Sequence, residues 1–413
     1  MKRRVTLGIV YHMPCWRAAD GTLREVEGSF ARYVDSLAPY FDEISLCVPV
    51  SSEPRGEGTP IRSSNVTLAP LPFFDGPAQF YPRLLGIVPR LARWARQIDL
   101  LHCRVPTPAA VFAFACARVA RRPAFLLVVG DLRALLPVVP YRGMKRALWR
   151  LYVSLEERSI QWMVERALTF ANGRALVEKH QRGRQLGHVI ETTTTTIRNE
   201  DIASRTDTCD GVPSGHVRAF TVSRIEPRKG LRVLPAALDR LASMGLDLTL
   251  DIVGPTVGRP GGDERDALLA EAENLGVKDR IALLGTVPLE RLLPLYRNYD
   301  LFVLPTLPGE GIPRVLLEAM SAGLPVVTTR VAGIPSLITH EDNGLLVDAP
   351  TPASMAAAIA RIVREPILRQ RLIANGYETA RRFTLERQSA RMMEEVSDAL
   401  HIALRHPVVL PAA

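Results

Sequence analysis

Cysteine is scarce in this sequence, and the few cysteines are not arranged for a disulfide framework or a metal. The chain of 413 residues contains five cysteines, scattered along it and without a Cys-x-x-Cys pair. A disulfide framework or a zinc site needs paired or clustered thiols. We therefore expect buried free thiols in a reducing compartment, and the protein is predicted to be cytoplasmic.

The sequence also lacks an apolar run long enough to cross a bilayer. Its longest apolar stretch, Pro106–Ala117, is far shorter than the roughly 20 residues that a membrane-spanning helix needs. The basic Lys2–Arg4 before the apolar Val5–Val10 superficially resembles a signal peptide, but the run is short and no small-residue cleavage site follows. We predict a first buried strand there and a protein that does not span a membrane.

Positive charge is unevenly distributed along the chain. The formal net charge is +9, yet residues 1–200 hold 28 basic and 17 acidic side chains, whereas residues 201–413 hold 24 and 26. A basic first half predicts contact with something anionic, such as a phosphorylated acceptor, an anionic membrane surface or nucleic acid. Because no nucleic-acid-binding motif is present, we predict no nucleic-acid partner.

Short apolar strands alternate with helical segments along both halves of the chain. In the second half, strands are predicted at Val217–Val222, Leu248–Val253 and Leu301–Leu304, among others. This alternation is typical of βαβ units, and the length suits two domains. The predicted fold class is α/β, with two Rossmann-like domains facing across a cleft, where ligands lie beyond the carboxyl ends of the strands.

Composition predicts the domain boundaries. Residues 1–200 form an N-terminal domain, and the polar residues 201–216 form a linker. Residues 217–385 form a C-terminal domain, and residues 386–413 form a helix and tail that return to the N-terminal domain.

The strongest chemical signal is the segment Leu304–Val327. A strand ends at Pro305, a Gly/Pro loop carries Glu310, and a helix begins near Pro313, where a missing N–H is tolerated. Glu318 follows inside the helix, where its carboxylate suits the vicinal hydroxyls of a ribose. Two glutamates in a helix opening are otherwise explained as capping and solvated surface.

The spacing of Glu310 and Glu318, with Glu-Ala-Met-x-Ala-Gly-x-Pro-Val-Val in frame, resembles the E-x7-E signature of retaining glycosyltransferase family 4 in the GT-B superfamily. The resemblance is close over residues 217–365 and loose over residues 1–200. It implies that residues 1–200 bind the acceptor and that residues 217–385 bind the nucleotide-sugar. It also implies that Glu310 faces the donor sugar and that Glu318 holds the ribose.

A second segment, Ser223–Gly230, ends a strand and opens a helix. It resembles the element of this family whose Arg and Lys grip the donor diphosphate, which implies this role for Arg224 and Lys229. Two cations there would stabilise the charge that grows on a departing nucleoside diphosphate. Arg228 competes with Lys229 for the role, although its position matches the family less well. Arg224, Lys229 and Glu310 are the predicted catalytic residues.

Further donor-binding residues surround these segments. The loop Gly285–Val287 resembles the base-contacting loop of the family, and the helix opening after Glu310 offers backbone N–H groups to a sugar hydroxyl or a phosphate. The predicted donor-binding set is Gly28, Asp131, Arg224, Lys229, Gly254, Thr286, Val287, Glu310, Gly311, Ile312, Pro313, Val315 and Glu318.

The first half departs from the family pattern. The family often carries a histidine at a strand end near the reacting sugar, whereas Gly130 occupies that position here, which leaves Asp131 as the nearest polar group. Asp131 either positions the sugar or acceptor, or caps a helix. His102, at a predicted strand end, is either functional or structural, and Gly28 lies in the loop where the family places a Gly-rich segment.

The segment Tyr81–Ile98 has apolar residues at helical spacing among arginines. It is a basic amphipathic helix that either lies on an anionic membrane, making the protein peripheral at its inner face, or packs on the core with a solvated face.

The resemblance implies transfer of a sugar from a nucleoside-diphosphate sugar with retention of anomeric configuration, the leaving diphosphate helping to deprotonate the acceptor. No Asp-x-Asp pair follows a strand, so we expect no metal and no other cofactor. UDP is favoured over GDP or ADP, and the acceptor is a carbohydrate or lipid-linked molecule in polysaccharide or glycolipid biosynthesis. The alternatives are a non-catalytic partner subunit and a sugar-nucleotide epimerase.

Overall fold

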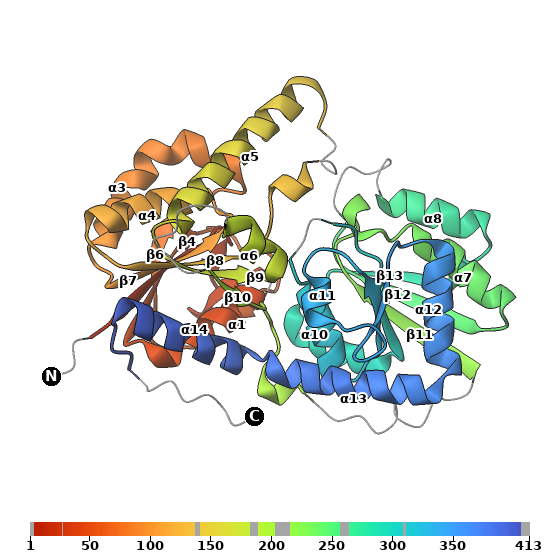
Figure 1. The fold of residues 1–413 in the computed structure, drawn as a ribbon. Helices are drawn as coiled ribbons and strands as arrows, with labels where there is room; N and C mark the ends of the chain where they lie inside the picture. The colour runs from red at the N-terminus through yellow and green to blue at the C-terminus, as the bar shows by residue number, and fades with distance from the viewer. Residues whose placement is uncertain are drawn as a thin grey trace. The chain divides into compact units, whose positions relative to one another are not determined.

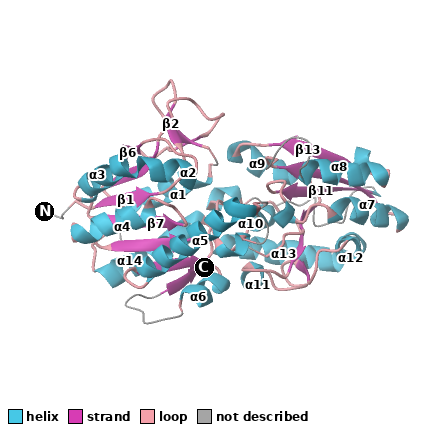
Figure 2. Cartoon of the chain, turned by 90° about the horizontal axis from the view of Figure 1, so that it is seen from above, coloured by secondary structure: helices cyan, strands magenta, loops and turns pink. Residues whose placement is uncertain are grey.

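The chain folds into two compact α/β units. The computed structural model describes residues 4–26, 28–136, 141–181, 189–202, 215–256, 264–308 and 311–405. The first unit comprises Met1–Thr196 with Leu385–Ala413, and the second comprises Ile197–Thr384. Each unit has its own sheet and its own hydrophobic core, with the strands lying between helices (Figure 2).

The first unit is built on a seven-stranded parallel sheet in the order β10-β9-β8-β7-β1-β4-β6. Its strands are β1 (Thr6–Val10), β4 (Glu43–Pro49), β6 (Val66–Leu71), β7 (Leu100–Val105), β8 (Ala124–Val128), β9 (Leu168–Asn172) and β10 (Val189–Thr192). The central strands are buried along their whole length, as expected for continuous apolar strands covered on both faces. A small antiparallel sheet joins β2 (Cys15–Arg17), β3 (Leu23–Glu25) and β5 (Thr59–Pro60).

Two sets of helices cover the two faces of this sheet (Figure 1). One face packs against α3 (Leu84–Ala95), α4 (Ala110–Val119) and α5 (Gly143–Val164), and the other packs against α1 (Ser29–Leu37) and α14 (Leu385–Leu400). The short helices α2 (Pro77–Phe80) and α6 (Arg174–His180) complete the unit.

The C-terminal helix α14 belongs to the first unit, which confirms the predicted return. Met392, Met393 and Val396 are buried in the core beneath α1. The Ser36 and Ser389 hydroxyl oxygens of the two helices lie 2.7 Å apart. The segment thus contributes to a core whose strands lie more than 190 residues earlier in the chain.

The second unit has a six-stranded parallel sheet in the order β13-β12-β11-β14-β15-β16. Its strands are β11 (His216–Val222), β12 (Asp247–Val253), β13 (Ile281–Gly285), β14 (Leu301–Leu304), β15 (Val326–Thr329) and β16 (Leu345–Val347). Its helices are α7 (Val233–Ser243), α8 (Glu264–Asn274), α9 (Leu289–Leu295), α10 (Arg314–Ser321), α11 (Ile334–Leu337), α12 (Pro352–Arg364) and α13 (Pro366–Arg382).

Each sheet has one point at which the strand order reverses. In the first unit the chain leaves β1 toward β4 and β6 and then returns to β7 on the other side of β1. In the second unit it leaves β11 toward β12 and β13 and returns to β14. Open α/β sheets bind ligands outside the carboxyl ends of the strands at such a point. The two sequence motifs of the second half follow β11 and β14, so both lie at this point.

Two absences expected from the sequence concern thiols and membrane spans. Cys15, Cys47 and Cys103 are free and buried, and Cys116 is free and half-buried, while Cys209 lies outside the described residues. Among the helices of the described ranges, none combines the length and the apolar character that crossing a bilayer requires.

Replacing Met393 with Ala tests the packing of α14. The side chain is fully buried, so the truncation is expected to lower the unfolding free energy of the first unit by about 2–5 kcal/mol. All four tryptophans lie in this unit, so urea unfolding followed by tryptophan fluorescence reports on it. Met144→Ala, at an 80% exposed position of α5 in the same unit, is the matched control, and equal losses in both variants would contradict the packing.

Candidate functional site

Backbone contacts join the loops that follow β11 and β14. The N–H of Leu307 donates to the carbonyl of Arg228 at 2.8 Å. Gly230 has a left-handed φ of 65°, and a Cβ atom there would lie 2.1 Å from the carbonyl oxygen of Pro305. The Ser223–Gly230 segment and the start of the Leu304–Val327 segment, about 80 residues apart in sequence, are therefore in direct contact.

The loops after β12 and β13 extend this edge. The N–H of Gly254 donates to the carbonyl of Gly285 at 2.8 Å, and a Cβ atom at Gly254 would lie 2.0 Å from the carbonyl oxygen of Ser223. Thr286 is exposed directly after β13, whereas Val287 is half-buried against the core. Four neighbouring strand ends thus carry the predicted donor-binding residues of this unit.

Arg224 and Lys229 differ in their surroundings. The Arg224 side chain is 54% exposed, and its Nε lies 3.7 Å from a carboxylate oxygen of Glu226. Lys229 ends the short 3-10 helix Pro227–Lys229 and is buried. The exposed guanidinium of Arg224 has the freedom to meet a ligand, whereas Lys229 is held within the loop.

Arg228, the competitor of Lys229, is tied to its own chain. Its Nε and Nη2 atoms donate to Oε1 of Glu226 at 2.7 and 2.6 Å. The side chain is buried, and a charged pair with this geometry neutralises both partners. Its contacts favour a structural role for Arg228 in holding the loop.

Glu318 is buried in α10, although one interpretation of the sequence placed its side chain on the solvated surface. The hydroxyl of Tyr296, in the 3-10 helix Tyr296–Asn298, donates to its Oε2 at 2.8 Å. Burial, and then the charge and hydrogen bond of Glu318, raise the pKa of Tyr296 well above its ordinary value, so this hydroxyl keeps its proton. The carboxylate is thereby fixed in orientation, and the solvated-surface interpretation is wrong.

The opening of α10 is close to its predicted position. The helix begins at Arg314 with Pro313 as its N-cap residue, and Val315 packs partly on the core. Gly311 and Ile312 are buried, and Gly333 fits against them because a Cβ atom there would lie 3.2 Å from the backbone nitrogen of Ile312. Glu310 itself lies outside the described residues.

In the first unit, Asp131 is engaged in local structure. Its Oδ1 accepts hydrogen bonds from the backbone N–H groups of Arg133 and Ala134 and from Nζ of Lys179, the last at 2.7 Å. Burial raises the pKa of this carboxyl, but the hydrogen bond and charge of Lys179 and the two backbone donors outweigh it, and the pKa is lowered. These contacts favour the helix-cap interpretation of Asp131.

Gly28 precedes α1 and adopts a left-handed φ of 78°. The carboxylate of Glu25, fully buried, accepts the backbone N–H groups of Phe30 and Ala31, both at 3.1 Å. The N-terminus of α1 is a natural anion site, and the chain fills it with its own carboxylate. A donor phosphate near Gly28 would have to bind beside Glu25.

His102 lies inside β7 and not at a strand end, because β7 continues to Val105. Its Nε2 is 2.9 Å from the hydroxyl of Tyr33, and its ring stacks on Phe125 at 4.2 Å between centroids. Burial, followed by the charge of Arg104, lowers its pKa to about 3. The contacts are those of a structural histidine.

Sequence reasoning missed the residues at the β1–β7 reversal point. His12 follows β1, and its Nδ1 is 2.9 Å from the Thr107 hydroxyl after β7. Arg104, near the end of β7, is buried with its guanidinium 4.8 Å from the ring centroid of Tyr11 and 4.6 Å from that of Tyr33. The sequence signal that could have revealed these residues was an arginine inside a mainly apolar strand.

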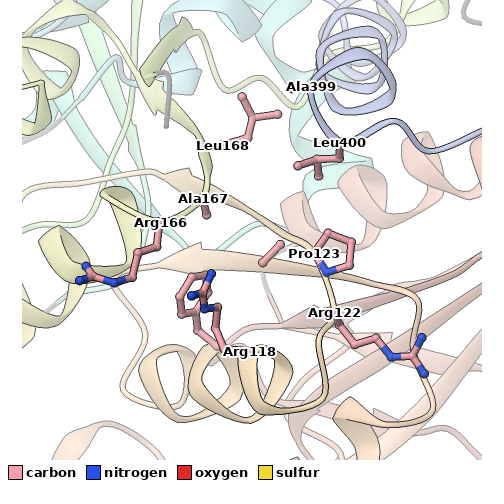
Figure 3. Close-up of a pocket in the computed structure, with 10 residues that line it drawn as sticks. Arg118, Arg122, Pro123, Arg166, Ala167, Leu168, Ala399 and Leu400 are labelled. Atoms are coloured by element: carbon pink, nitrogen blue, oxygen red, sulfur yellow. The ribbon is translucent and has the colours of Figure 1, made fainter. Parts of the chain in front are cut away.

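A surface hollow of about 240 Å³ lies elsewhere, at the amino ends of β8 and β9. Its lining comprises Phe114, Arg118, Arg122, Pro123, Ala124, Arg166, Ala167, Leu168, Ala399 and Leu400. The guanidinium groups of Arg122 and Arg166 point away from one another (Figure 3) and bond to Asp99 and Glu165. The hollow contains none of the predicted site residues and lies at the opposite end of the strands.

Metal-ligating side chains are not clustered within the described ranges: no group of three or more His, Cys, Asp or Glu residues there has the geometry to hold a metal ion.

The two units have the fold of the GT-B glycosyltransferases. HepE of Anabaena in complex with UDP and glucose superposes with a TM-score of 0.69 at 19% identity, covering 96% of this chain and 100% of that one. Sucrose-phosphate synthase of Thermosynechococcus elongatus gives a TM-score of 0.73 at 17% identity, with 96% and 100% covered. At such identities the likeness establishes the fold.

The sequence comparison adds a likeness of the second unit to a known family. Residues 211–379 match the family described as "Glycosyl transferases group 1". The D-inositol 3-phosphate glycosyltransferase of Corynebacterium glutamicum is 31% identical over 192 residues, 46% of this chain and 45% of that protein. That of Segniliparus rotundus is 32% identical over 188 residues, 46% and 41% of the two chains. The chain aligns with less than half the length of these relatives, and the predicted resemblance to GT-B glycosyltransferases is confirmed.

His102 makes a prediction about pH. An unfolded histidine has a pKa near 6.5, so as the pH falls from about 6.5 toward 3 the unfolded chain binds a proton that folded His102 does not. His102→Gln keeps a partner for Tyr33 without titrating, so it is expected to lose less stability than the natural chain between pH 7 and pH 5. Urea unfolding followed by tryptophan fluorescence at both pH values measures this, and identical losses would show that His102 titrates normally.

Gly230→Ala tests the contact between the two loops. The left-handed backbone alone costs an alanine about 1–2 kcal/mol, and the clash with Pro305 should add at least about 2 kcal/mol. Gly245→Ala is the control, because its φ is 78° and no atom lies within 4 Å of the added Cβ. Hydrogen exchange across β11 and β14 should rise far more in Gly230→Ala. Equal exchange in both variants would mean that the loops are not packed together.

Proposed function

We propose that this protein transfers a sugar from a nucleoside-diphosphate sugar to an acceptor, with the donor bound at the β11–β14 reversal point of the second unit. The observation that supports the proposal is the contact between the loop that carries Arg224 and Lys229 and the loop that leads to α10, the helix of Glu318, in a unit that matches the model of the group 1 glycosyltransferases. Two cations and an oriented carboxylate are what a diphosphate and a ribose diol require.

Each residue has a distinct role in the proposed reaction. Arg224 and Lys229 bind the diphosphate and stabilise the charge that develops as it leaves, the largest electrostatic demand of the reaction. Glu318, oriented by Tyr296, accepts the ribose hydroxyls. Glu310 faces the donor sugar, a role that rests on the family resemblance. The leaving diphosphate takes the acceptor proton, and the anomeric configuration is retained.

The remaining donor residues frame the same edge. Thr286 and Val287, after β13, are proposed to contact the base, and Gly254 permits close approach of the β12 loop. Backbone groups at Gly311, Ile312 and Pro313, with Val315 behind them, are proposed to line the sugar. Gly28 and Asp131 remain proposals for the first unit, although the contacts of Asp131 favour a cap.

The proposed donor carries UDP, and no metal is required. Solved neighbours with this fold are complexes with UDP and with UDP-glucose. The curated relatives are named for inositol 3-phosphate, and the first half of this chain is basic, so we propose a phosphorylated or lipid-linked carbohydrate acceptor. Such an acceptor suits polysaccharide or glycolipid biosynthesis at the cytoplasmic side of a membrane.

Nucleotide binding is the first test of the donor site. UDP should raise the melting temperature of the natural chain with or without EDTA, because it binds the native state alone. Arg224→Gln and Glu318→Gln should each weaken UDP binding about ten- to hundredfold, since each removes a charge-assisted hydrogen bond. Calorimetric titration with UDP, GDP, ADP and CMP provides the affinities.

Arg240→Gln is the matched control, because this exposed arginine ends α7 far from the carboxyl edge of the sheet. Its affinity for UDP should be unchanged. If the folded protein binds no nucleoside diphosphate, the non-catalytic partner subunit replaces the transferase. If it binds UDP-glucose but changes the sugar without releasing UDP, the epimerase does.

A further inference from the structure

Helix α5 carries an apolar stripe on its exposed side. Met144, Leu148, Leu151 and Leu155 are 80%, 59%, 56% and 50% exposed. They recur at intervals of four, three and four residues, which places them on one face of the helix. In Figure 1 the N-terminal half of α5 extends beyond the helices packed beside it.

The stripe is not the face that holds α5 to its unit. That contact is made by Ile160, Met163 and Val164, which are buried against the sheet and α4, and Val153 is buried as well. At 100° per residue these side chains point away from the Met144–Leu155 stripe. A surface helix ordinarily has one apolar face, and large contiguous apolar patches mark interaction sites.

The exposed charged residues of α5 are all basic, and they are Lys145, Arg146, Arg150 and Arg158. At 100° per residue, Lys145 and Arg158 lie nearest to the stripe, one on each side of it, whereas Arg146 lies on the opposite side of the helix. The two acidic residues of α5 do not offset them, because Glu156 is buried and Glu157 pairs with Lys179. The stripe is therefore flanked by positive charge.

Aromatic rings continue this surface toward the preceding helices. Tyr141 packs edge-on against Trp149, Trp149 packs against Tyr152, and Tyr152 reaches Tyr81 at 6.3 Å between centroids. Tyr81 is 42% exposed and Tyr141 is 44% exposed. Tyrosine and tryptophan favour the boundary between lipid and water.

The sequence pattern of Tyr81–Ile98 left two interpretations, a membrane-binding helix and a helix packed on the core, and the first of them is wrong. Its apolar residues Ile87, Leu91, Trp94 and Ala95 are buried in the core of the first unit. The core-packed alternative is therefore right for α3, and the apolar face left uncovered belongs to α5.

We propose that α5 docks the protein on an anionic membrane surface, with Met144, Leu148, Leu151 and Leu155 among the acyl chains and the flanking Lys and Arg on lipid phosphates. A second copy of this chain is a poorer occupant, because apposing two such faces would bring their arginines together. The surface is separate from the donor site, and it would hold the proposed transferase where lipid-linked acceptors lie.

Cosedimentation with vesicles tests the docking. The purified full chain should bind vesicles of phosphatidylcholine that contain about 30% phosphatidylglycerol, an anionic lipid that makes the vesicle surface negative. It should bind vesicles of pure phosphatidylcholine far less. Leu148→Ser with Leu151→Ser should lower the partition coefficient roughly tenfold or more. Lys145→Gln with Arg158→Gln should lower it about thirtyfold at low salt.

Matched controls use exposed residues of the second unit. Ile367→Ser, at an 81% exposed position of α13, is the control for the leucine substitutions in α5. Arg240→Gln with Arg382→Gln is the control for the substitutions of basic residues in α5. All variants should keep the UDP-induced rise in melting temperature, so a failure of docking is separable from a failure of the donor site.

Three outcomes would overturn the proposal. The natural chain could fail to bind the anionic vesicles, or it could bind them with no loss in either α5 variant. It could also form a dimer, measured by sedimentation velocity, that the leucine substitutions dissociate, in which case the stripe is an interface between copies.

Discussion

The close approach of Gly230 to the carbonyl oxygen of Pro305 is the constraint on which the donor edge depends. It allows the loops after β11 and β14 to meet at the point where the strand order reverses, and the bond from Leu307 to Arg228 holds them there. A side chain at position 230 would separate the Ser223–Gly230 segment from the loop that leads to α10. The proposed donor site depends on this contact, because it would join the cations on one loop to the carboxylate on the next helix.

Such close packing buries charge, and each buried charge is compensated in a different way. Arg228 is neutralised by Glu226, and the Glu318 carboxylate receives the hydroxyl of Tyr296. Burying either group without its partner would cost several kcal/mol. Arg224 is the contrasting case, because it is half exposed and only loosely paired. The edge therefore combines paired charges, which hold its shape, with the exposed charge of Arg224.

The sequence predicted the second unit better than the first for a physical reason. In a parallel sheet, local order along the chain decides which loops share an edge, so strand–loop–helix segments were enough to predict that the loops after β11 and β14 lie side by side. His102 and Asp131 instead depend on partners in other elements. Tyr33 is 69 residues from His102, and Lys179 is 48 residues from Asp131. Nothing in the local sequence reveals such partners, so their structural roles could not be predicted.

The contrast between α3 and α5 shows a limit of periodicity as a signal. Most apolar residues of α3, though not the exposed Leu85, lie on one face, so its amphipathic pattern is plain in the sequence, yet that face is the one that packs on the sheet. On α5 one apolar face packs on the core and a second points outward, and in the sequence the two opposed faces cancel, leaving little amphipathic pattern. A helix that binds its own fold on one side and a partner on the other is therefore the kind that periodicity passes over, and it becomes recognisable only once burial tells the two faces apart.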